Sequence, residues 1–175
     1  MILNKIVVAT DGSTNAARAL DVAIDLAKRY DANLTVVHAV ISGELPSGMV
    51  DWARAEHLVD EQTRAPAAPQ TLEDGRLGTP TPDYGVRVAY EAREGVARAV
   101  ADHAKSRAQS AGIRNVHTIV DDGDPAQVIG NAITQEAADL AVIGTRGHGT
   151  LKGLLVGSVS HKLVGMHLCP TLVVP

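Results

Sequence analysis

The chain has 175 residues, of which 45% are hydrophobic, and a formal net charge of -4 at pH 7, which predicts one globular domain with a substantial core. Aromatic residues make up only 2% of the sequence and phenylalanine is absent, so the core must consist of Val, Ile, Leu and Ala. Because there is no basic excess and few rings could stack on bases, we expect no nucleic-acid partner.

The first predicted element is a buried strand over residues 5–9, a short apolar run. The run is too short for a signal-peptide core or a membrane span, so we expect a cytoplasmic protein without a membrane span. Cys169 is the only cysteine, so no internal disulfide can form, in agreement with a reducing compartment.

A helix is predicted over residues 14–30, with Ser13 or Thr14 as its N-cap. Its apolar stripe consists of Ala16, Ala19, Leu20, Ala23, Ile24 and Ala27. Residues 34–40 then predict a second strand. Residues 42–85 interrupt this alternation with repeated prolines and little periodicity, although residues 51–64 could form a short helix around Trp52. We interpret this segment as an insertion that is a lid, a binding loop or a disordered stretch.

After the insertion, residues 94–111 predict a helix that ends before Gly112. Its inward stripe is predicted to be Val96, Ala99, Val100, His103, Ala104 and Ala108. Residues 116–120 predict a strand. The next helix begins at Asp124 and Pro125, a capping acid followed by proline at the first helical position. We interpret the acidic run 121–124 as this loop and cap, since the spacing and the final glutamate of a calcium loop are missing.

The last predicted elements are a strand at residues 140–143, a helix at 158–167 and a strand at 171–174. Strands that alternate with helices predict the fold class α/β: an open, doubly wound, five-stranded parallel sheet with helices on both faces. We expect one domain over residues 1–175.

The most informative segment joins the strand at 140–143 to the helix at 158. Two residues separate Gly144 from Gly147 and nine separate Gly147 from Gly157, and we call these three residues the glycine ladder. Glycine allows the main chain to approach a ligand closely or to adopt a positive φ, and a helix start offers unpaired N–H groups. The ladder therefore predicts a phosphate-binding loop. It lacks the Gly-Lys-Ser/Thr of a Walker loop and the full dinucleotide fingerprint.

Two other strand ends should meet this loop at the carboxyl edge of the sheet. Asp11 is a candidate for a ribose hydroxyl or a phosphate-bound metal, unless it only caps the helix. Ala39 could offer backbone groups to a base. Ser158 and Ser160 could add hydroxyls for phosphates or merely cap their helix. His38 lies in an apolar strand, which favours a hydrogen-bonded core histidine over a catalytic one.

Taken together, the run 10–13, the glycine ladder with Ser158, and the closing run 169–174 resemble the universal stress protein family. The resemblance covers nearly the whole chain except residues 42–85, and the intact glycine pattern is similar to the family's ATP-binding branch. It implies a Rossmann-like fold of the adenine nucleotide alpha hydrolase type. It also implies binding of ATP or a related adenine nucleotide, with Mg²⁺ or Mn²⁺ on the phosphates and Asp11 as a candidate metal ligand.

Carried over by position, the resemblance implies that Ala9 and Asp11 lie by the ribose, that the Ala39 backbone meets adenine, and that the ladder surrounds the phosphates. The implied nucleotide-binding set is Ala9, Thr10, Asp11, Ala39, Val40, Gly144, Thr145, Arg146, Gly147, His148, Gly157, Ser158, Val159 and Ser160. We expect Gly157→Val to abolish nucleotide retention and to leave the fold intact.

The resemblance further implies a homodimer in which residues 172–174 pair with their two-fold mate, and an exposed edge strand supplies a physical motive for it. The expected function is that of a stress or signalling regulator, not an enzyme, whose ATP occupancy alters its dimer state or its choice of an unidentified protein partner. Two alternatives remain open: a slow ATP-hydrolysing enzyme of the adenine nucleotide hydrolase-like class, and a sensor of AMP or cyclic AMP.

Overall fold

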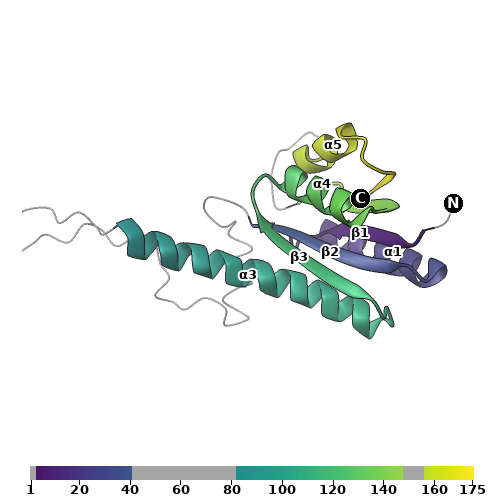
Figure 1. Ribbon diagram of the computed structural model, residues 1–175, viewed down its shortest axis with the longest axis horizontal. Helices are drawn as coiled ribbons and strands as arrows, with labels where there is room; N and C mark the ends of the chain where they lie inside the picture. The colour runs from purple at the N-terminus through teal and green to yellow at the C-terminus, as the bar shows by residue number, and fades with distance from the viewer. Residues whose placement is uncertain (1–2, 41–81, 148–155) are drawn as a thin grey trace, which may run out of the picture. The chain divides into compact units, whose positions relative to one another are not determined.

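The computed structural model describes residues 3–40, 82–147 and 156–175, with residues 82–92 described by their backbone alone (Figure 1). In these residues one parallel sheet has five strands in the order β3-β2-β1-β4-β5. The strands are β1 (Lys5–Ala9), β2 (Asn33–Val40), β3 (Val116–Asp122), β4 (Leu140–Gly144) and β5 (Thr171–Val174). The strand order reverses between β1 and β4, so the predicted fold class, α/β with an open doubly wound parallel sheet, is confirmed.

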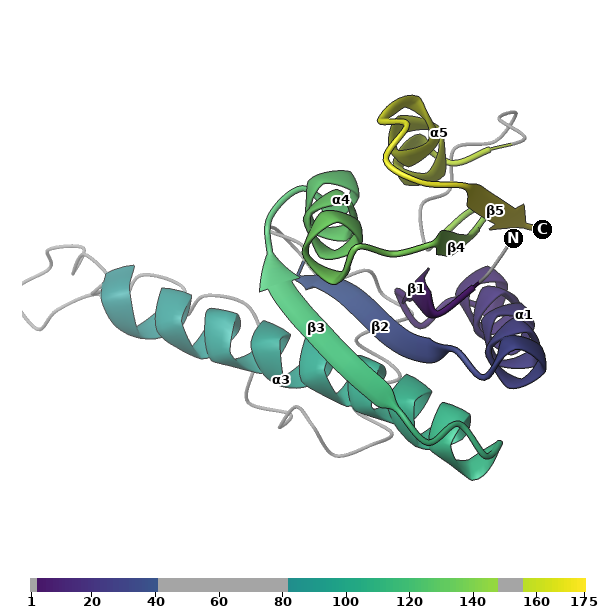
Figure 2. The ribbon, with the colours of Figure 1, turned by 45° about the vertical axis from the view of Figure 1, so that its right-hand side comes forward.

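Helices cover both faces of the sheet (Figure 2). The described helices are α1 (Thr14–Tyr30), α3 (Pro82–Ser110), α4 (Pro125–Glu136) and α5 (Ser158–Gly165). On one face α1 and the C-terminal part of α3 pack with Ile6 and Val8 of β1 in one core cluster. On the other face α4 and α5 pack with Val7 in a second cluster. Successive side chains of β1 from Ile6 onward therefore alternate between two buried layers, which explains why residues 6–9 are all apolar.

The first helix matches its prediction. Ser13 is the N-cap, and its side-chain oxygen accepts a hydrogen bond from the amide of Ala16 at 3.2 Å. The helix ends at Asp31, which adopts the left-handed conformation with φ 51°. Its buried residues are Ala16, Ala19, Leu20, Ala23, Ile24 and Ala27, the predicted stripe.

The helix α3 differs from its prediction in its start and in its buried stripe. It begins at Pro82 rather than at residue 94, so its first turn overlaps the end of the segment interpreted as an insertion. Proline is tolerated in a first helical turn, where its missing N–H would have no partner anyway, so this proline is not a loop signal. Ala97 and Ala101 are buried, whereas His103 is exposed and Ala99 only half-buried. Alanines on several sides of the helix made the stripe ambiguous.

The helix α4 has the predicted cap. Asp124 is the N-cap, its carboxylate accepts from the amide of Gln127 at 3.1 Å, and Pro125 is the first helical residue. The preceding strand β3 runs on to Asp122, so the acidic run is the end of a strand and a cap. The predicted short helix at residues 51–64 and Trp52 lie outside the described residues.

The chain divides into two compact units, Met1–Glu44 with Ala97–Pro175, and Leu45–Val96. The first unit contains the whole sheet and every described residue of the candidate site. Of the second, the structure describes residues 82–96, which belong to α3. No helix in the described part of the chain has both the length and the apolar character that a membrane crossing requires.

Candidate functional site

The candidate site lies at the carboxyl ends of β1, β2 and β4, where the strand order reverses. Asp11 follows β1 and Gly147 follows β4, and the two loops meet: a Cβ added to Gly147 would overlap the Asp11 carboxylate. Where the strand order reverses, the connections after β1 and β4 leave the carboxyl edge of the sheet in opposite directions. Ligands of such sheets bind between connections of this kind. The structure thus brings together the two segments from which the sequence predicted a ligand site.

The loop after β1 is held by local hydrogen bonds. The amide of Ser13 donates to Asp11 Oδ1 at 2.9 Å, and the amide of Gly12 donates to Thr10 Oγ1 at 3.3 Å. Gly12 has φ 79°, a conformation that glycine adopts without strain. These contacts orient the half-buried carboxylate of Asp11, while the capping of α1 falls to Ser13.

Two ladder glycines are explained by close approach of the backbone within the protein. A Cβ on Gly144 would stand 2.9 Å from the carbonyl carbon of Asn15, and one on Gly157 would stand 3.0 Å from the carbonyl oxygen of Thr145. None of the three ladder glycines has a positive φ. The expectation that Gly157→Val leaves the fold intact stays a prediction, and it requires the Thr145 carbonyl to shift by a few tenths of an ångström.

The start of α5, at the end of this segment, leaves backbone amides available to a ligand. Its N-cap is Gly157, and no side chain in the described structure caps it, whereas Ser13 caps α1 and Asp124 caps α4. The amide of Gly157 itself donates to the carbonyl of Thr145 at 2.5 Å. The first amides of the helix, at residues 158–160, have no acceptor within the helix and carry the positive end of its dipole. They suit an anion.

The polar residues of this segment fall into two groups. Ser158 is exposed, whereas Ser160 is buried and its hydroxyl donates to the carbonyl oxygen of Gly144 at 2.7 Å. This bond ties α5 to the end of β4 and accounts for Ser160 without a ligand. Arg146 is exposed and Thr145 and Val159 are half-buried. His148 lies outside the described residues.

The strand-end residues of the predicted set are buried. Ala9, Thr10, Ala39 and Val40 are all at least nine-tenths buried. That the Ala39 backbone meets a base stays a prediction. His38 is a buried, hydrogen-bonded histidine, as predicted, and its partner is the Thr10 carbonyl oxygen, 2.8 Å from Nδ1. A polar residue in an apolar strand was the one signal in the sequence that pointed to such a partner.

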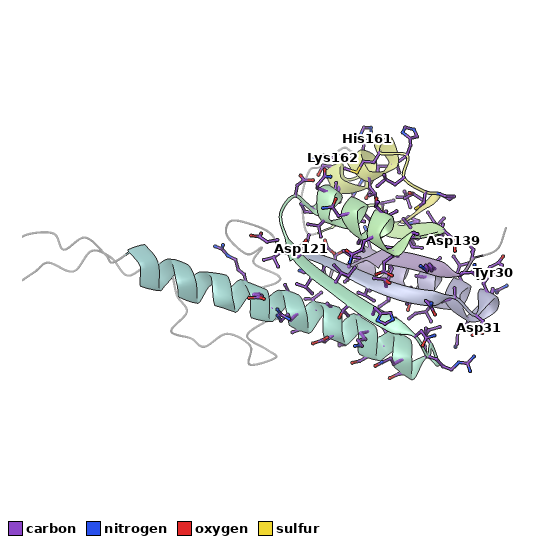
Figure 3. All side chains as sticks on the ribbon, in the orientation of Figure 1. Tyr30, Asp31, Asp121, Asp139, His161 and Lys162 are labelled. Carbon is purple, nitrogen blue, oxygen red and sulfur yellow. The ribbon has the colours of Figure 1, made fainter. Side chains whose placement is uncertain are left out.

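An ion pair joins α5 to the start of α4. Lys162 Nζ is 3.0 Å from Asp124 Oδ1, and Figure 3 shows the Lys162 side chain on α5. The hydrogen bond from Lys162, with that from the Gln127 amide, holds the pKa of the Asp124 carboxyl below its ordinary value, because both favour the ionised form. Among the described residues no three His, Cys, Asp or Glu side chains gather as a metal-binding group.

Comparisons with known proteins agree over the length of the chain. The model of the Universal stress protein family matches residues 3–175. Universal stress protein YxiE of Bacillus subtilis (strain 168) is 32% identical over 177 residues, with 99% of each chain covered. A solved universal stress protein in complex with cAMP has a TM-score of 0.61 at 24% identity, covering 100% of this chain and 99% of that chain. One from Archaeoglobus fulgidus in complex with dAMP has a TM-score of 0.56 at 20% identity and covers 100% of both chains. At these identities the structures show a shared fold.

Proposed function

The chain belongs to the universal stress protein family, and from this premise we propose that it binds an adenine nucleotide at the carboxyl ends of β1, β2 and β4. The observation that carries the proposal is the uncapped start of α5, which stands beside the loop that meets Asp11. Phosphates suit such a helix start, since its amides and dipole both favour an anion. Relatives of the same fold solved with cAMP and with dAMP support adenine as the base.

In this proposal each part of the nucleotide has its own residues. The phosphates lie at the amides of residues 158–160 and beside Gly147. The ribose hydroxyls donate to the carboxylate of Asp11, which its bond from Ser13 already orients. The base meets the backbone of Ala39, whose side chain is buried and small.

A divalent cation, Mg²⁺ or Mn²⁺, would enter with the phosphates. Asp11 fits such an ion because its carboxylate lies at the loop junction, and oxygen ligands suit both metals. The described residues contain no group of three acidic, histidine or cysteine side chains that could hold a metal by themselves. The ion would supply charge neutralisation of the phosphates, and the protein would orient them.

We propose a regulator that holds its nucleotide rather than an enzyme that consumes it. Two buried polar side chains beside the site serve local structure: Ser160 bonds to Gly144 and His38 to Thr10. Nucleotide occupancy would then alter dimerisation or the choice of a protein partner. The cytoplasmic location stays a prediction that no observation here tests.

The decisive experiment identifies the nucleotide and follows its fate. The purified protein is denatured with acid and the released nucleotide is identified by chromatography; nucleotide-free protein is then titrated calorimetrically with ATP, AMP and cAMP, and incubated with ATP and Mg²⁺. We expect tightest binding of ATP without multiple turnovers. Repeated turnover would favour the hydrolase, and preference for AMP or cAMP would favour a sensor of those ligands. Failure of all three to bind would overturn the proposal.

A further inference from the structure

His38 occupies an unusual position at the edge of the candidate site. It lies near the end of β2, is 3% exposed, and its Nδ1 is 2.8 Å from the Thr10 carbonyl oxygen. Because a carbonyl oxygen can only accept, Nδ1 carries the hydrogen in this bond. The bond therefore specifies one tautomer of the ring.

This bond stands where a bond between the strands would otherwise form. The pairing of β1 with β2 ends at Ala9 opposite Val37, and the Thr10 amide still donates to the Val37 carbonyl oxygen at 2.9 Å. In a continuing parallel ladder the next bond would run from the Ala39 amide to the Thr10 carbonyl oxygen. In the described structure that carbonyl accepts from the His38 ring, and no backbone bond from Ala39 reaches it.

The replacement of the backbone hydrogen bond by the His38 ring bond affects both strands. Directly after β1, the amide of Thr10 is held by Val37 and its carbonyl by His38, which sets the peptide plane that leads into Asp11. On β2, backbone groups of alternate residues face the same neighbour, so the Ala39 amide faces the same side as the Val37 carbonyl. That side lies beyond the last paired residue of β1, at the opening of the site.

We propose that His38 is a positioning residue for the nucleotide: its Nδ1–H takes the place of the Ala39 amide on Thr10. It thereby orients the Thr10–Asp11 peptide and leaves the Ala39 amide for the base. The inference rests on the proposed function, which it deepens by naming a donor that acts through the backbone. A histidine that only filled the core would have no effect on nucleotide affinity beyond its effect on stability.

The test compares two substitutions of His38 with a control in the core. His38→Asn keeps an N–H donor at the same number of bonds from the backbone as Nδ1, whereas His38→Leu keeps bulk without a donor. Ile24→Val, in the α1 core, lowers stability away from the site. ATP affinity of the full chain is measured by calorimetry, with chemical denaturation of nucleotide-free protein alongside.

We expect His38→Leu to weaken ATP binding by about three- to tenfold, the equivalent of one hydrogen bond. His38→Asn and Ile24→Val should stay within about twofold of the wild type. Unchanged affinity in His38→Leu would overturn the proposal, and so would an equal loss in His38→Asn, because the donor would then not be the cause. A wild type that binds no nucleotide would instead overturn the proposed function and this role with it.

A measurement without nucleotide tests the contact itself. In ¹H–¹⁵N NMR spectra of the wild type, the His38 ring should carry its hydrogen on Nδ1. A neutral ring with hydrogen only on Nε2 would show that the Thr10 contact does not form, and the proposal would fail even if the protein binds ATP.

Discussion

At the scale of single residues, the glycine ladder is one pattern with several physical causes. Gly144 is required by the backbone of Asn15, and Gly157 by the carbonyl of Thr145. Gly147 differs, because its added Cβ would meet only the Asp11 carboxylate, a side chain that can move. Two ladder positions therefore serve the fold of the loop directly, and the third controls where a candidate ligand group can stand.

This distinction leads to a prediction for Gly147→Ala. The added methyl group must displace the Asp11 carboxylate, so nucleotide affinity should fall by roughly tenfold, about 1.4 kcal/mol, while the free energy of unfolding changes little. Gly165→Ala is the matched control, since a Cβ there meets nothing within 4 Å. Calorimetric titration with ATP measures both variants. Equal affinity in the two would show that the position of Asp11 does not limit binding.

Substitutions of the two serines of α5 should likewise differ in their effects on stability and on ATP binding. Ser160→Ala removes a buried donor and leaves the Gly144 carbonyl without that bond, so the free energy of unfolding should fall by about 1–3 kcal/mol. Ser158→Ala, at an exposed position, should leave stability unchanged and weaken ATP binding only if its hydroxyl meets a phosphate. Urea denaturation of nucleotide-free protein compares them. Equal stability of the two variants would contradict the role assigned to Ser160.

At the scale of elements, the N-termini of the helices differ in how they are capped. Both α1 and α4 begin with an oxygen-bearing cap, Ser13 and Asp124, and α5 begins with a glycine. Asp124 also accepts from Lys162 in a half-exposed ion pair, so the cap of α4 contacts the helix whose own start is open. The first amides of α5 have no side-chain acceptor, so they remain available to a ligand.

The ion pair gives a prediction about pH. A carboxyl whose pKa is lowered in the folded protein stabilises it above the ordinary aspartate pKa, and that contribution fades as the pH falls through the folded-state value. Lys162→Met should raise the pKa of Asp124 toward its ordinary value and leave the backbone hydrogen bonds of Gln127 and Ala126 to lower it. Lys162→Arg should keep the pKa low. Carboxyl ¹³C chemical shifts followed against pH measure it, and an unchanged pKa in Lys162→Met would contradict the contact.

At the scale of the whole molecule, β5 is an edge of the sheet. Leu172 on this strand is 38% exposed, and Val164 and Leu168 nearby in sequence are 45% and 46% exposed. Exposed apolar side chains beside an unpaired edge favour association, because both the backbone groups and the apolar surface gain partners. The homodimer through this strand therefore stays our proposal, with a physical motive but no partner chain to show it.

The register of β5 suggests a selective test of that dimer. The carbonyls of Pro170 and Val174 both accept from the β4 side, so residue 173 directs its backbone groups outward. Val173→Pro removes an outward amide that β4 does not use. Because a two-fold dimer contains this change twice, about two hydrogen bonds are lost, and the dimer dissociation constant should rise at least tenfold. Val173→Ala keeps the amide, so its dimer dissociation constant should stay closer to that of the wild type. Sedimentation equilibrium measures both, and a wild type that sediments as a monomer would contradict the proposed dimer.

Much of the fold follows from local patterns in the sequence. The bounds of α1 and its buried stripe match their predictions, as do the caps at Ser13 and Asp124. These features depend on neighbouring residues alone: an apolar period of a helix, or an oxygen beside its first amides. The start of α3 differs from its prediction because Pro82 and Gly85 match a loop locally, although the backbone there is helical from Pro82 onward.

The family resemblance, the pattern of strands and helices, and the set of candidate nucleotide-binding residues all follow from the sequence. The contacts of these residues come from the folded structure: Gly147 meets Asp11, Ser160 holds Gly144, and the His38 ring takes the place of a strand bond. The reason is physical. A local pattern fixes what a residue can donate, accept or bury, whereas its partner is fixed by strands that pair across long stretches of chain.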